Sequence, residues 1–168
     1  MCIIEGAVLH ATPEKLLNDF ETFGLLFESM CIRDLRVYAD ALGGDVFHYR
    51  DKTGLESDAV IGLHDGRWAL IEVKLGEKQV DIAAAHLKKL ADRIDQDHEG
   101  RPSFLMVLTA TAAAYRRDDG VLVVPLATLA RELDRAFDPS FPTQKEKARA
   151  AGPGLEKEEE EEGIQLWG

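Results

Sequence analysis

The sequence predicts one compact domain that combines helices with a sheet, followed by a tail of different composition. The chain has 168 residues, of which 45% are hydrophobic, and this is enough for a single core. Apolar residues at helical spacing alternate along the chain with short strand-type runs. No stretch of 18 consecutive apolar residues occurs, so we expect no membrane insertion. Two cysteines without a CxxC pair indicate a reduced, cytoplasmic protein.

Two helices are predicted before the first strand. Thr12-Pro13-Glu14 has the pattern of an N-cap, a proline at the first helical position and an acid in the first turn. We expect Gly24 to interrupt the short helix that begins there. Beyond this glycine, apolar residues recur at helical spacing as far as Leu42, and Gly43-Gly44 supplies a stop.

The next segment has the pattern of an antiparallel meander. Turn residues at 51–54 and 64–66 separate three strand-type runs. The runs are Asp45–Arg50, Leu55–Leu63 and Arg67–Leu75.

The remaining pattern completes the domain and then changes. From Val80 helical spacing returns and ends near Gly100, and two strands and a closing helix follow. These last elements are predicted at Phe104–Leu108, Val121–Val124 and Leu126–Phe137. Residues 139–168 are rich in Pro, Gly, Lys and Glu, which predicts a disordered acidic C-terminal tail.

An acid and a base stand two residues apart inside the apolar run IEVKLG. In a strand, residues i and i+2 lie on one face about 6.6 to 6.8 Å apart, so Glu72 and Lys74 should point the same way. A buried ionised pair needs mutual hydrogen bonds, solvent or a metal ion. Most Glu-x-Lys pairs on strands are exposed ion pairs of little energetic value, and this interpretation stays open.

The turn at 64–66 determines whether Asp58 can join this pair. A two-residue turn would place Asp58 on the opposite face, because a one-residue slip inverts every side chain. A three-residue turn with Gly66 in the left-handed region pairs Leu63 with Arg67 and sets Asp58 opposite Glu72. We favour the second register because it gathers the apolar residues of both strands on one face.

Asp58 and Glu72 in this register could share a divalent cation. Hard oxygen ligands suit Mg²⁺ or Mn²⁺, so we predict a first shell of the two carboxylates and the Val73 carbonyl. Lys74 could orient or deprotonate an attacking water and stabilise charge at a phosphate. Glu28, on the preceding helix, could hold a metal-bound water or a second ion.

Histidines and net charge limit the other interpretations. His48, His64 and His86 have no mutual spacing typical of a metal site, so we expect surface or turn positions.

The chain has 31 acids against 20 Lys and Arg, a net charge of −11. Passive binding to nucleic acid through a basic surface is therefore not supported, and such a role would need metal ions or a cationic partner.

The order of these features resembles the PD-(D/E)XK nuclease superfamily. The phrases that carry the resemblance are FES with Glu28, YRDKTGLESDAV with Asp58, and IEVKLG with Glu72 and Lys74. The likeness is closer to one group, the nuclease-like C-terminal domain of unknown function found in prokaryotic AAA-type ATPases. It covers about residues 12 to 130. Two departures are Ser57 before Asp58, where the superfamily has proline, and the lack of any GxxxxGK[ST] motif.

The resemblance implies a restriction-endonuclease-like α/β fold, with a central mixed sheet flanked by helices. The nuclease-like domain would be a single one at 12–138, after an N-terminal stub at 1–11. The resemblance also assigns Glu28, Asp58 and Glu72 to the acidic positions and Lys74 to the lysine.

Two functions follow from this comparison. The first is a Mg²⁺- or Mn²⁺-dependent nuclease-like domain that hydrolyses phosphodiester bonds, of DNA rather than RNA, with an ATPase partner acting in trans. The alternative is a non-catalytic protein-interaction module derived from the ATPase-associated domain.

Overall fold

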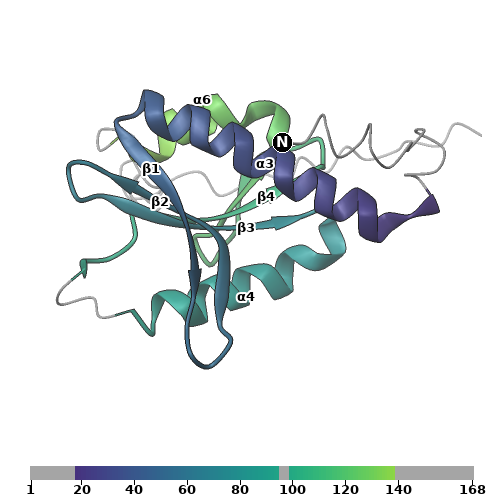
Figure 1. Cartoon of the computed structure of the whole chain (residues 1–168), viewed down its shortest axis with the longest axis horizontal. Coiled ribbons are helices and arrows are strands. Elements are labelled where there is room, and N and C mark those ends of the chain that lie inside the picture. The colour runs from purple at the N-terminus through teal and green to yellow at the C-terminus, as the bar shows by residue number, and fades with distance from the viewer. Residues whose placement is uncertain (1–17, 95–98, 139–168) are drawn as a thin grey trace, which may run out of the picture. The chain divides into compact units, whose positions relative to one another are not determined.

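A mixed, open six-stranded sheet forms the centre of an α/β domain, and the described residues form three α-helices on this sheet (Figure 1). The structure is a computed structural model, and it describes residues 18–94 and 99–138. The strand order is β1-β2-β3-β4-β6-β5. The elements are α3 (Phe20–Ala41), β1 (Gly44–Arg50), β2 (Glu56–Leu63), β3 (Trp68–Lys74), α4 (Val80–Ala91), β4 (Phe104–Thr109), β5 (Tyr115–Arg116), β6 (Leu122–Pro125) and α6 (Leu129–Phe137). The predicted helix start at Thr12, the stub and the tail lie outside the described residues.

One continuous helix, α3, replaces the predicted break at Gly24. Its N-cap is Asp19, whose carboxylate accepts the Thr22 N–H at 3.1 Å. A glycine inside a helix costs only about 1 kcal/mol relative to alanine, and the burial of large side chains on the same helix outweighs it. The side chains that α3 buries recur every four residues, at Phe27, Cys31, Leu35 and Ala39.

The β2–β3 hairpin has the predicted register. Gly66 has φ 88° and its N–H donates to the Leu63 carbonyl at 3.0 Å, while the Leu63 N–H donates to Arg67 at 2.8 Å. Val60 therefore pairs with Leu70, as the three-residue turn requires. The apolar residues of both strands on the α3 side are fully buried: Ala59, Ile61, Ala69 and Ile71. The predicted meander is confirmed, since β1, β2 and β3 pair antiparallel.

The second half of the sheet is mostly parallel. Strand β3 pairs parallel with β4 across the α4 crossover, and β4 pairs parallel with β6. Helix α4 ends at Ala91, earlier than predicted, and the two-residue strand β5 was not predicted. Helices α3 and α6 cover one face of the sheet and α4 covers the other (Figure 1).

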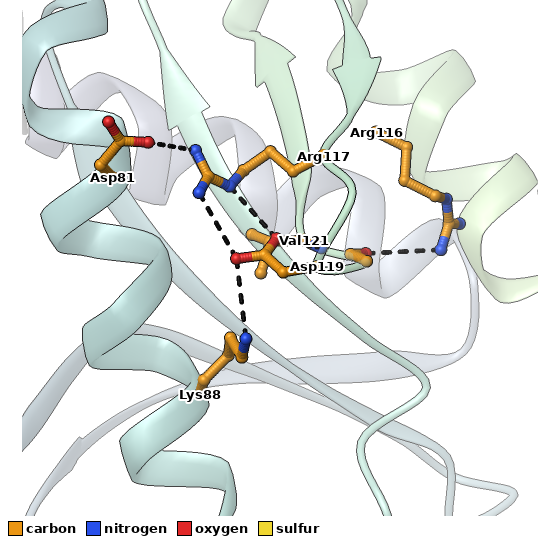
Figure 2. A network of polar contacts seen from close by, with 7 residues as sticks. Asp81, Lys88, Arg116, Arg117, Asp119 and Val121 are labelled. Atoms are coloured by element: carbon orange, nitrogen blue, oxygen red, sulfur yellow. Dashed lines mark hydrogen bonds and ion pairs between the residues drawn. The ribbon is translucent and has the colours of Figure 1, made fainter.

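Exposed ion pairs tie α4 to the turn between β5 and β6 (Figure 2). The Arg117 guanidinium contacts Asp81 on α4 and lies 3.2 Å from the Asp119 carboxylate. Lys88 reaches the same Asp119 at 3.7 Å. Among the described residues, no helix combines the length and the hydropathy that a membrane crossing requires.

Candidate functional site

Asp58, Glu72 and Lys74 converge at one end of the β2–β3 hairpin. The Lys74 ammonium lies 2.9 Å from Glu72 Oε1 and 3.9 Å from Asp58 Oδ2. Glu72 and Lys74 lie on the strand face opposite Ile71 and Val73, which pack on the α3 side. The structure thus brings two of the three predicted acids, Asp58 and Glu72, next to the ammonium of the predicted lysine.

A local irregularity of β2 places Asp58. The paired residues of the β2–β3 ladder end at Ala59 and Ile71. Asp58 is the next residue of β2 beyond this ladder. Its carboxylate accepts the Val73 N–H at 2.7 Å, in the place that a backbone carbonyl of β2 would take in a regular ladder. Within a strand the N–H and C=O of one residue point to the same side, so the Val73 carbonyl faces the same edge as its N–H. Two carboxylates and a backbone carbonyl therefore lie at this edge.

The site carries more buried negative charge than positive charge. The side chains of Asp58 and Glu72 are 19% and 9% exposed, and both share the single ammonium of Lys74. Burial raises the pKa of Asp58 above its ordinary value, and the neighbouring Glu72 charge adds to this. The Val73 hydrogen bond and Lys74 lower that pKa but do not cancel the rise. A further cation would therefore be favoured here.

The residues present fit a hydrated divalent cation. Carboxylate and carbonyl oxygens are the ligands that Mg²⁺ prefers, and Mg²⁺ usually keeps several waters when it binds a protein. The Lys74 ammonium lies 2.9 Å from Glu72 Oε1 and 3.9 Å from Asp58 Oδ2, so both carboxylates face one cationic group. The described residues contain no group of three His, Cys, Asp or Glu side chains that could hold a metal ion.

Glu28 lies near this site but outside its contacts. It is an exposed residue of α3, and with Val73 and Lys74 it lines a surface cavity of about 280 Å³. Its charge contributes to the raised pKa of Asp58. Glu28 therefore acts on the site through its charge, from the rim of this cavity.

The comparison with protein families covers this whole region. A family model described as a domain of unknown function, DUF4143, matches residues 23–129. The chain belongs to this family. No curated protein and no solved structure matches the sequence. The matched segment of the DUF4143 domain includes Glu28, Asp58, Glu72 and Lys74.

His86 is a member of the site that sequence reasoning missed. We expected a surface or turn histidine, but its side chain is only 29% exposed and Nδ1 lies 3.3 Å from Glu72 Oε2. The buried stripe of α4 includes Ala83, Leu87 and Leu90, and His86 borders this stripe next to β3. The sequence signal that could have indicated this position is that His86 directly precedes Leu87, a member of the apolar stripe of the helix. His64, in contrast, is exposed and lies 3.5 Å from Asp45 in the DUF4143 domain.

Proposed function

We propose that this DUF4143 domain is a metal-dependent, nuclease-like domain that hydrolyses phosphodiester bonds of nucleic acid, DNA rather than RNA. The observation that supports the proposal is the convergence of Asp58 and Glu72 on one ammonium at the end of a buried hairpin. Bound Mg²⁺ or Mn²⁺ would polarise a phosphoryl oxygen and lower the pKa of an attacking water.

Each residue has a role that its position supports. Asp58, Glu72 and the Val73 carbonyl would hold the ion at the open edge beside the hairpin. Lys74, on a flexible chain next to both carboxylates, would orient the attacking water and stabilise charge on the phosphate. Glu28, at the rim, would hold an ordered water.

The charge of the chain limits how substrate reaches the site. With a net charge of −11 the chain gains little from neutralising phosphates, so unaided binding to DNA would be weak. An ATPase partner that delivers nucleic acid in trans would supply the missing affinity.

A protein-interaction module without catalysis is the second candidate. Its motivation is the apolar surface of α3, where Phe20, Leu25 and Val37 are 70%, 63% and 61% exposed. A contact with another protein would remove this apolar surface from water.

Cleavage assays with matched variants test the first proposal. Plasmid, linear and single-stranded DNA, and RNA, would be incubated with the protein and Mg²⁺ or Mn²⁺. Asp58→Ala and Lys74→Ala should abolish cleavage. Glu56→Gln, at a partly exposed acid of the same strand that lies 3.5 Å from Arg50, and Lys52→Ala should leave it unchanged. Cleavage that survives in the site variants would exclude this site.

Calorimetric titration with Mn²⁺ separates the two candidates. The nuclease proposal expects heat of binding in the wild type that Glu72→Ala abolishes. Absence of any heat in the wild type would reject a metal-dependent function and favour the interaction module.

A further inference from the structure

The carboxylate of Glu72 has a different partner on each oxygen. Lys74, from the same strand, contacts Oε1 at 2.9 Å, and His86, from α4, lies 3.3 Å from Oε2. The Lys74 ammonium also lies 3.9 Å from Asp58 Oδ2, so Oε1 is the oxygen on the Asp58 side. Oε2 is consequently the oxygen that faces the helix.

The two partners differ in how firmly they are held. A lysine ammonium is a point charge on a flexible four-carbon stem. His86 has a short, planar side chain, and the helix that carries it is anchored by Leu87 and Leu90, both fully buried. The terminal torsion of a glutamate is broad and has no strong preference of its own. A donor fixed on another element can therefore set the plane of this carboxylate.

We infer that His86 is a positioning residue, which donates a hydrogen bond from Nδ1 to Glu72 Oε2 and so keeps Oε1 directed toward Asp58. This inference rests on the proposed function, because Oε1 is the oxygen that would share a cation with Asp58. When Lys74 turns to water or phosphate, His86 is the partner that keeps Glu72 in place. Partners of this kind typically contribute 10- to 100-fold to metal affinity.

A purely structural role for His86 makes a different prediction. If the imidazole only joined α4 to β3, its replacement would lower stability and leave the affinity for metal unchanged. The apolar contacts of Ala83, Leu87 and Leu90 hold α4 on the sheet independently of the imidazole. We therefore expect His86 variants to fold.

The test is calorimetric titration of the full chain with Mn²⁺, with thermal unfolding of each variant as a control for folding. His86→Phe keeps a ring but removes the donor, and it should weaken Mn²⁺ binding about 10- to 100-fold. His86→Asn, whose amide nitrogen can take the place of Nδ1, should recover most of the affinity. His48→Phe, the same change at an exposed position of β1, should have no effect.

The outcomes separate the inference from the proposed function. Equal Mn²⁺ affinity of the wild type and His86→Phe would overturn the role of His86 and leave the nuclease proposal standing. No binding by the wild type would overturn both. Imidazole ¹⁵N spectra of the metal-free protein give a readout that needs no variant to fold. A proton on Nδ1 supports the inference, and an unprotonated Nδ1 overturns it.

Discussion

Replacement of Asp58 by asparagine should stabilise the domain at neutral pH, although it removes a charge close to Lys74. Burial raises the pKa of Asp58, so its ionised form is disfavoured in the folded state. Asparagine has nearly the same shape, and its carbonyl oxygen can keep the Val73 hydrogen bond of 2.7 Å, a contact of about 1 kcal/mol. Lys74 retains Glu72 at 2.9 Å. We expect a gain of about 0.5 to 2 kcal/mol in the free energy of unfolding, the range of charge-optimising substitutions.

The pH dependence gives this prediction its sign. The folded-state pKa of Asp58 is raised, so its ionisation costs stability above that pKa and nothing below the ordinary value of 3.8. The advantage of Asp58→Asn should therefore be complete once the pH exceeds the folded-state pKa and vanish as the pH falls toward 3.8. Urea unfolding at several pH values measures this advantage, with Glu56→Gln, at a partly exposed acid of the same strand, as the control. A loss of more than about 1 kcal/mol at pH 7 would mean that the pair with Lys74 is a stabilising contact, and would refute the reasoning.

Two further predictions concern the core and the sheet edge. Burial raises the pKa of the Cys31 thiol to about 12. In Cys2→Ser protein, a disulfide reagent at pH 8 should therefore react with Cys31 only after unfolding. Rapid labelling of the native state would contradict this. Gly44→Ala should cost about 1 to 3 kcal/mol in urea unfolding, because the new Cβ would lie 2.5 Å from the Gly62 carbonyl oxygen. Gly76→Ala, whose Cβ meets nothing within 4 Å, should change stability by less than about 0.5 kcal/mol, and equal losses at both glycines would count against the steric explanation.

The hairpin was predictable because turn chemistry and burial point to the same register. Glycine tolerates a φ of 88° at Gly66 without strain. A one-residue slip would have taken Ala59 and Ile71 away from the core face, where both are fully buried. The register brings Asp58 to the level of Glu72, and this part of the candidate site was accessible from sequence. The irregularity beyond Ala59, where the Asp58 carboxylate accepts the Val73 N–H, was not.

Other features depend on contacts between segments that are distant in the sequence, so the local sequence pattern does not predict them. Gly24 did not end α3, because packing of the helix on the sheet outweighs the local preference of one glycine. Strand β5 has two residues, too few for a periodicity. His86 meets Glu72 only because the crossover after β3 brings α4 back over that strand, which no spacing between histidines could reveal.

The balance of charge distinguishes a functional interpretation of this site from a structural one. At the surface, Arg117 and Lys88 match Asp81 and Asp119 with equal numbers of positive and negative groups. At the hairpin end, the buried Glu72 and the part-buried Asp58 share one lysine ammonium, the imidazole of His86 lies beside Glu72, and burial raises the pKa of Asp58.

Buried charge without full neutralisation costs stability, so stability alone does not explain why the site has this composition. A bound cation would supply the missing positive charge. Asp58→Asn therefore has a joint signature under the nuclease proposal, in which stability rises while Mn²⁺ binding is lost. If the site is only a structural ion cluster, Asp58→Asn should lower stability, and neither the wild type nor the variant should bind Mn²⁺. Unfolding and Mn²⁺ titration of this one variant therefore decide between the interpretations.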